Sequence, residues 1–261
     1  MKTRKQKVAE QLLQVDRYFV GDFTVRGKAA PAAANPPADA EPAQAAPPPA
    51  GPIPADKAQP RPDAEPGLAR IAAQIAQCQK CELAQTRTHT VPGEGNPRPR
   101  IAFVGEAPGE DEDRQGRPFV GRAGQLLDKI IAAMGLKRSD VFICNILKCR
   151  PPGNRDPKPD EVEKCSPYLQ EQLELLRPEV IVALGSHAAK TLLDTNLAIG
   201  KLRGRFHDYY FSPMLPPIKL MPTYHPAYVL RNYTDQTRLQ VWEDMQTVLK
   251  ELGLPVPARK T

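Results

Sequence analysis

The stretch Val141–Arg155 reads Val-Phe-Ile-Cys-Asn-Ile-Leu-Lys-Cys-Arg-Pro-Pro-Gly-Asn-Arg. Its first half is rich in β-branched and aromatic residues without alternation, which is typical of a strand buried on both faces of a sheet. Its second half contains Pro151, Pro152 and Gly153, which forbid regular structure. A buried strand thus ends in a stiff loop, and open α/β sheets bind their ligands at the carboxyl ends of strands. We expect this loop to be the floor of an active site.

Strand-like and helix-like segments alternate along the rest of the chain. Short apolar runs predict three further strands, at Arg100–Gly105, Val180–Leu184 and Ile218–Met221. This alternation predicts an α/β fold, a three-layer α/β/α sandwich with a central, mostly parallel four-stranded sheet. The helices are expected at Leu68–Gln77, Gln125–Met134, Lys158–Leu176, His187–Leu193 and Gln236–Leu252.

Three loops leave the carboxyl ends of the predicted strands. They carry Glu106–Asp113, Cys149–Asn154 and Tyr224–Arg231. Because the ends of parallel strands lie at one edge of a sheet, we expect these loops to converge on a single site. Two other segments are expected to be irregular: Thr90–Pro99 as a turn-rich loop, and Lys201–Ser212 as a loop or hairpin.

The chain has 261 residues and 30 prolines, and the prolines are concentrated in one region. Residues 29–66 are rich in Ala and Pro, which predicts a disordered, semi-rigid linker. Residues 1–28 could form a short amphipathic helix that docks a protein partner on this tether, or a frayed tail. The folded domain is expected over residues 67–254, with a C-terminal tail at 255–261. The formal net charge of +6 lies mostly in the domain and is compatible with a polyanionic partner.

The chain has five cysteines, and no apolar run long enough for a signal peptide or a membrane span follows the basic Met1–Lys7. We therefore expect the cytoplasm, a reducing compartment where cysteine pairs bind metals before they form disulfides. Cys144 lies inside the predicted strand and is expected to be a small buried hydrophobe. The other four thiols have no histidine nearby, so they fit either a tetrahedral zinc, the commoner metal, or an iron–sulfur cluster. They are Cys78, Cys81, Cys149 and Cys165.

Four motifs follow one another along the domain. They are Gly-Glu-Ala-Pro-Gly-Glu-Asp-Glu-Asp at 105–113, Gly-Arg-Pro-Phe-Val-Gly at 116–121, Asn-Ile-Leu-Lys-Cys-Arg-Pro-Pro-Gly-Asn-Arg at 145–155 and His-Pro-Ala-Tyr-Val-Leu-Arg at 225–231. Together with the ordered cysteines, they resemble the family 4 uracil-DNA glycosylases, the iron–sulfur type of bacteria and archaea. The resemblance extends from about Leu68 to about Leu252.

The resemblance implies a DNA repair glycosylase that flips uracil out of DNA and hydrolyses its N-glycosidic bond, leaving an abasic site. It also implies that a [4Fe–4S] cluster, rather than zinc, is bound by Cys78, Cys81, Cys149 and Cys165. We expect a monomer that acts on uracil-containing DNA at the nucleoid of a bacterial cytoplasm, without contact with a membrane.

Three side chains are expected to surround the uracil. Asn145 offers a donor and an acceptor on one rigid plane, which complements uracil and rejects cytosine. Phe119 is expected to stack on the base. His225 is expected to donate to uracil O2 and so to stabilise the departing anion. Without the resemblance, Asn145 could instead cap a loop, Phe119 could pack in the core and His225 could have a structural role.

The loop after the first predicted strand should approach the base and the sugar through Glu106, Ala107 and Pro108. The better-known glycosylase families often carry Asp or Asn at the position of Ala107, so a simple general base is not expected there. Glu106, Glu112 and Asn154 are the candidates for holding the attacking water or the oxocarbenium-like sugar. Of these, Glu106 and Asn154 are predicted to be catalytic together with His225, and Glu112 to bind the substrate.

The DNA itself should be held through its phosphates. Arg155, Lys148, Arg231 and the loop Arg203–Arg205 are expected to surround the mouth of the site. Residues Tyr228–Leu230 are expected to wedge into the gap that the flipped base leaves.

Two other functions remain open at this stage. One is a uracil-DNA binding protein that traps its substrate, and the other is a replication-associated iron–sulfur adaptor without turnover. Relatives that trap DNA carry an additional histidine near the second motif, and no histidine occurs between His89 and His187. The presence of both Asn145 and His225 favours the enzyme over the adaptor.

Overall fold

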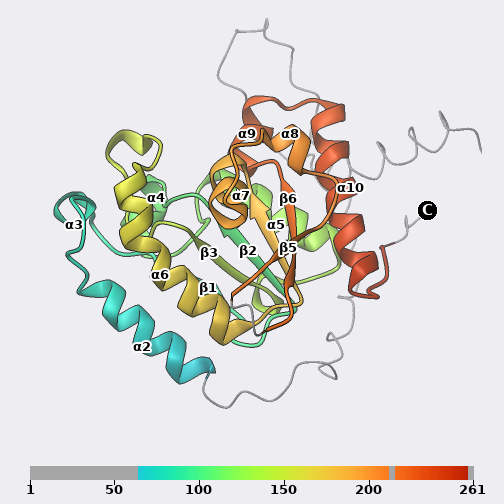
Figure 1. Ribbon diagram of the computed structural model, residues 1–261. Helices are drawn as coiled ribbons and strands as arrows, with labels where there is room; N and C mark the ends of the chain where they lie inside the picture. The colour runs from blue at the N-terminus through green and yellow to red at the C-terminus, as the bar shows by residue number, and fades with distance from the viewer. Residues whose placement is uncertain (1–63, 212–214, 258–261) are drawn as a thin grey trace, which may run out of the picture.

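The computed structural model describes residues 64–211 and 215–257 (Figure 1). The expectations for residues 1–28 and for most of the predicted linker lie outside the described residues. Helix α2 (Ala64–Ala76) begins inside the range predicted as linker, and Ala64 is buried. Within the described ranges, no helix is both long and apolar enough to cross a membrane.

The described residues form an α/β structure around one six-stranded sheet with the strand order β1-β3-β2-β4-β6-β5. The four strands β3, β2, β4 and β6 run parallel, as predicted. The outer strands β1 and β5 pair antiparallel with β3 and β6. The strands are β1 (Glu94–Gly95), β2 (Ile101–Gly105), β3 (Phe142–Asn145), β4 (Val180–Leu184), β5 (His207–Tyr209) and β6 (Ile218–Thr223).

Helices cover both faces of the sheet, so the predicted three-layer sandwich is confirmed (Figure 1). Helices α5, α9 and α10 share one apolar core with the sheet, and α6, α7 and α8 share the other. Helix α2 packs outside α6 and buries Ile71 and Ile75 against Tyr168. The helices and 3-10 turns after α2 are α3 (Leu83–Thr86), α4 (Glu110–Gln115), α5 (Arg122–Ala133), η1 (Arg138–Asp140), η2 (Pro152–Asn154), α6 (Pro159–Leu176), α7 (Ser186–Leu193), α8 (Ile199–Leu202), α9 (Pro226–Arg231) and α10 (Asp235–Glu251).

The sheet has two more strands than the four predicted. Strand β1 has two residues and lies in the predicted turn-rich loop, and β5 has three residues and lies in the predicted loop or hairpin. Runs this short carry no readable periodicity, because their pairing is fixed by the neighbouring strand rather than by their own composition. Both are edge strands, and short edge strands limit pairing with other chains.

Each of the three predicted loops contains a short helical segment, namely α4, η2 and α9. The prediction that Pro151, Pro152 and Gly153 exclude regular structure is therefore wrong for the single 3-10 turn that they begin. Pro152 is accommodated because it opens the turn, where its missing N–H is not needed. Gly153 is accommodated because it takes a positive φ of 64°.

A crevice opens at one end of the sheet because the helices that follow neighbouring strands pack on opposite faces. The helices that follow β2 and β6 pack on one face, whereas those that follow β3 and β4 pack on the other. Connections that diverge in this way leave a crevice above the carboxyl ends of the strands between them.

Candidate functional site

A cleft of about 900 Å³ lies above the carboxyl ends of the parallel strands. The three predicted loops meet in its wall, so the expectation that they converge is met. All the side chains predicted to bind or cleave the substrate line it: Glu106, Ala107, Pro108, Glu112, Phe119, Asn145, Asn154 and His225.

Asn145 ends β3 beside Gly105, the last residue of β2. The side chain is only 1% exposed, and its Oδ1 has no hydrogen-bond partner among the described residues. A buried acceptor left in this state costs about 1–3 kcal/mol, so it points to a ligand that supplies the donor. A Cβ at Gly105 would lie 2.3 Å from this Oδ1 and 2.6 Å from Cζ of Phe119. Only glycine therefore fits at the end of β2.

Phe119 is buried in the cleft wall and has a positive φ of 51°, which is unusual outside glycine. Arg138 holds this backbone in place: its Nη1 donates to the Phe119 carbonyl at 3.2 Å, and its Nη2 donates to the Pro118 carbonyl. The ring lies with its centroid 5.7 Å from that of the His225 ring, tilted by 34°. The two rings thus form adjacent walls of one slot beside Asn145.

His225 is the N-cap residue of α9, where Pro226 opens the helix. Its Nδ1 accepts the backbone N–H of Ala227 at 3.1 Å, so in the neutral ring the proton is on Nε2. Burial, reinforced by the charge of Arg231, lowers the pKa of His225 to about 4. At neutral pH this imidazole is therefore an uncharged donor through Nε2.

Glu112 braces the cleft. Its Oε1 accepts the N–H groups of Val120 and Gly121 at 2.8 and 2.9 Å, and its Oε2 accepts that of Gly109 at 3.1 Å. These bonds join the loop after β2 to the start of α5. The carboxylate is therefore committed to the backbone, which does not favour the predicted role of holding water.

The two predicted catalytic residues besides His225 have different surroundings. Asn154 is exposed, and its Oδ1 accepts Nε of Arg150 at 2.7 Å. Glu106 is partly buried, and burial raises the pKa of its carboxyl above the usual value. Its Oε2 lies 4.0 Å from Nε2 of His187, which lies 3.6 Å from Oδ2 of Asp156.

Sequence reasoning missed His187 and Asp156 as cleft residues. A signal for His187 was present, because the residue follows the carboxyl end of β4 at the start of α7. Asp156 lies beyond the predicted loop and gave no comparable signal.

The predicted phosphate contact of Lys148 is wrong, because this residue is 1% exposed. Its Nζ donates to the Asn145 carbonyl at 2.8 Å and to Oε1 of Gln172 at 2.7 Å. Lys148 thus supports the backbone of Asn145. Among the other predicted cations, Arg231 is exposed and lines the cleft.

Two further expectations at the mouth need correction. Arg155 is paired with Glu161, so it is not a free cation, although it lines the cleft. Val229 is fully buried, so the predicted wedge cannot include it. Its neighbour Tyr228 is 40% exposed and lines the cleft.

The four predicted metal ligands line a second cavity, between α3, the loop after β3 and α6. We call Cys78, Cys81, Cys149 and Cys165 the cysteine corner; all four are free thiols. Arg87 Nη1 donates to Sγ of Cys149, and the N–H of Lys148 donates to Sγ of Cys165, both at 3.3 Å. Burial raises the pKa of the Cys165 thiol to about 11.

A second group of possible metal ligands lies in the cleft. In the described part of the chain, the one trio of His, Cys, Asp or Glu ligand atoms within 4.8 Å of one another is Glu106, Asp156 and His187. Cys144, expected to be structural, is fully buried in β3.

The family model described as the uracil DNA glycosylase superfamily matches residues 92–246. The chain is 45% identical over 199 residues to a type-4 uracil-DNA glycosylase of Sulfurisphaera tokodaii, covering 74% of this chain and 88% of that protein. It is 48% identical over 187 residues to that of Archaeoglobus fulgidus, covering 70% and 90%. It is 46% identical over 177 residues to that of Thermotoga maritima, covering 67% and 90%.

Proposed function

The chain belongs to the uracil DNA glycosylase superfamily, and we propose that it excises uracil from DNA in the cleft above β2, β3, β4 and β6. It is a DNA repair hydrolase of N-glycosyl bonds, and its reaction leaves an abasic site. The target nucleotide must leave the base stack to enter such a cleft. The roles of individual residues below are our proposal.

Asn145 selects uracil, and its unpartnered Oδ1 is the observation that carries this proposal. Uracil presents an N–H at N3, which satisfies this acceptor, whereas N3 of cytosine is itself an acceptor. Cytosine would therefore leave two buried acceptors facing each other, an arrangement that strongly disfavours binding. The bond from Lys148 to the Asn145 carbonyl fixes the backbone from which the amide projects.

His225 stabilises the departing base. As the N-glycosidic bond breaks, negative charge develops on the uracil ring and its carbonyl oxygens. An Nε2–H donor aimed at O2 stabilises that charge more than it stabilises neutral uracil, which lowers the barrier. The N-cap bond from Ala227 holds the ring in the required tautomer.

Phe119 supplies the face against which the flipped base stacks. Its ring lies beside both the Asn145 amide and the His225 imidazole, so stacking and hydrogen bonding act on one ligand. Glu106 is the best placed of the acidic residues to orient water or to face the oxocarbenium-like sugar. The carboxylate of Glu112 and the amide oxygen of Asn154 are already engaged.

The cysteine corner holds a [4Fe–4S] cluster. Four thiolates are a suitable donor set for a cluster or for zinc. The similarity to type-4 uracil-DNA glycosylases, the iron–sulfur type, supports the cluster over zinc. When bound, the cluster would clip α3 and the end of α2 to the loop after β3, a structural contribution rather than a chemical step.

Uracil-containing DNA is the partner, and the exposed Arg231 at the cleft is one contact for its phosphates. The setting is the bacterial cytoplasm, at the nucleoid, and the enzyme acts as a monomer. Residues 1–28 dock a protein partner.

Incubation with a uracil-containing oligonucleotide, followed by alkali, tests the function. The wild-type protein should produce strand scission at uracil and none at cytosine. Asn145→Ala should reduce the single-turnover rate by roughly 10²–10³-fold, because the buried recognition bonds are lost. Asn196→Ala, an exposed asparagine outside the cleft, is the matched control. A stable protein–DNA adduct would indicate trapping instead, and intact DNA an adaptor without turnover.

A further inference from the structure

A cation and two aromatic rings are stacked at the rim of the cleft. The ring centroids of Tyr224 and Tyr228 are 5.0 Å apart, with an interplanar angle of 29°. The guanidinium carbon of Arg203 lies 5.4 Å from the Tyr224 centroid. Tyr224 is therefore in contact with a guanidinium as well as with the outer ring, an arrangement stabilised by the negative face of the aromatic ring.

The inner end of this stack is fixed by buried charge. Arg203 donates through Nε and Nη2 to the carboxylate of Asp244, at 3.1 and 2.7 Å. Asp244 is fully buried in α10 and also accepts the Thr223 hydroxyl at 2.7 Å. The guanidinium is thus held by a two-pronged ion pair with little freedom to move. Because this ion pair anchors the stack, the outer ring, that of Tyr228, is presented in a defined orientation.

The outer end of the stack is open. Tyr228 is 40% exposed, and it is one of three large apolar side chains exposed in the described residues, the others being Leu197 and Tyr210. Of these, only Tyr228 lines the cleft. Arg231 follows at position i+3 on the same short helix, so an exposed cation accompanies the exposed ring. A ring for a base beside a cation for a phosphate is the composition of single-strand binding sites.

We propose that Tyr228 is a stacking platform for an unpaired nucleobase next to the flipped uracil, and that it adapts this enzyme to single-stranded DNA. The inference rests on the proposed function of the cleft. In a duplex, the base next to the flipped uracil stays paired with its complement and stacked on its other face, so the helix fixes its position. In a single strand that base is free to turn onto the ring, and stacking on an aromatic ring favours binding about tenfold or more.

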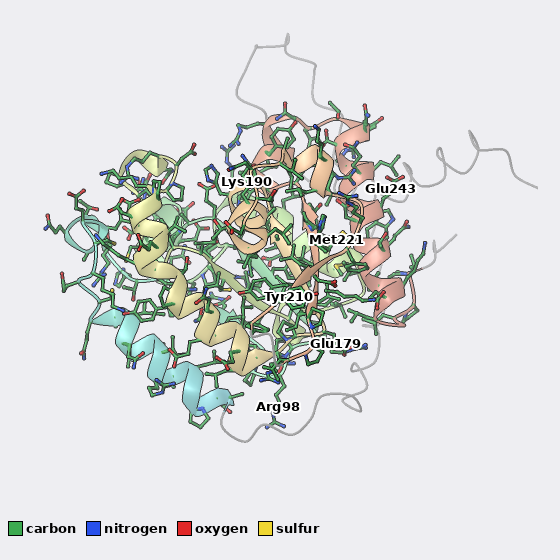
Figure 2. The ribbon with its side chains drawn as sticks, viewed as in Figure 1. Arg98, Glu179, Lys190, Tyr210, Met221 and Glu243 are labelled. Atoms are coloured by element: carbon green, nitrogen blue, oxygen red, sulfur yellow. The ribbon has the colours of Figure 1, made fainter. Side chains whose placement is uncertain are left out.

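The test compares kcat/KM on a uracil oligonucleotide, alone and annealed to its complement. Tyr228→Leu keeps apolar volume but removes the ring face. We expect it to lower the ratio of single-stranded to duplex kcat/KM about tenfold, chiefly through KM. The matched control is Tyr210→Ala, since Tyr210 is 61% exposed yet lies near the end of β5, on the side of Glu179 rather than of α9 (Figure 2). This control should leave the ratio as it is in the wild type.

A second measurement reports stacking directly. A 2-aminopurine placed next to uracil in the single strand should be quenched on binding to the wild-type protein but not to Tyr228→Ala. A larger loss on the duplex than on the single strand would show a wedge and overturn the proposal, as would unchanged quenching. If the wild type releases no uracil from either substrate, the proposed function itself is wrong, which is a different outcome from a failed platform.

Discussion

In the cleft, the functional side chains are held by hydrogen bonds from the chain itself, whereas in the cysteine corner the thiols are enclosed mainly by apolar groups. His225 is fixed by the N–H of Ala227, and the loops around Phe119 are fixed by Glu112 and Arg138. One acceptor, Oδ1 of Asn145, remains for the substrate. In the cysteine corner, Nη1 of Arg87 and the backbone N–H of Lys148 donate to sulfur. The cleft is thus organised before DNA arrives, but the corner depends on the group that it binds.

The two regions are nevertheless joined at two points. Lys148 donates its backbone N–H to Sγ of Cys165 and its side chain to the carbonyl of Asn145. The buried Asp113 of α4 accepts the N–H of Thr88, in the segment that follows the cysteine pair, at 2.9 Å. Disorder in the corner should therefore reach the cleft through the loop after β3 and through α4.

The largest effect is expected from removing a ligand of the cluster. Cys165→Ala should give colourless protein whose unfolding midpoint falls by roughly 10 °C or more, because metal binding is coupled to folding. Hydrogen exchange should speed up in α2 and α3 while β2 and β4 stay protected.

The matched control is Cys144→Ala, since this buried thiol lies in β3 outside the corner. It should keep the brown colour and cost only about 1–2 kcal/mol of stability. Equal loss of protection in the sheet would contradict the separation of the two regions.

Removing the imidazole tests the cleft without touching the corner. His225→Asn keeps a side chain that can cap α9, so the fold should be preserved while the Nε2–H donor is lost. Excision should slow by roughly 10²–10³-fold, the usual effect of losing one donor to developing charge. The affinity for uracil-containing DNA should change by less than about threefold, because the lost donor acts mainly on charge that develops in the transition state. A parallel loss of binding and cleavage would remove the transition-state role, and His207→Asn provides a control outside the cleft.

A smaller effect is expected from adding one methyl group beneath the slot. In Gly105→Ala the new Cβ would lie 2.3 Å from Asn145 Oδ1 and 2.6 Å from the Phe119 ring, so both must shift. A displacement of this kind can reduce the rate by up to about 10²-fold. Gly200→Ala is the matched control, because nothing lies within 4 Å of a Cβ there and the site is in α8. If Gly105→Ala excises uracil at the wild-type rate, the slot is less closely fitted than the distances indicate.

The difference between the two regions also explains what could be predicted from sequence. The positions of Asn145 and His225 at strand ends follow from topology, because parallel strands bring their carboxyl ends to one edge. The environment of Lys148 does not follow, since a lysine is almost never fully buried and its partners come from distant elements. The same holds for Glu112, whose three N–H donors are fixed only when the loops pack. The type and order of the four parallel strands and of the long helices could therefore be predicted from the sequence. The hydrogen bonds that orient the side chains of the cleft could not, because their partners meet only in the folded chain.

The smallest effect concerns the pH dependence of His225. Burial lowers its pKa to about 4, below the 6.5 of an ordinary imidazole, so the unfolded chain takes up the proton first as the pH falls. The free energy of unfolding should therefore decrease as the pH falls from about 6.5 towards 4, by at most about 3 kcal/mol from this group. His225→Asn should lack that part of the pH dependence in urea titrations. In NMR spectra the wild-type ring should keep its Nε2–H tautomer down to about pH 5, because the Ala227 N–H occupies Nδ1. A titration near pH 6.5 would mean that the imidazole is solvated, and the cleft would then have to organise its donor only when DNA binds.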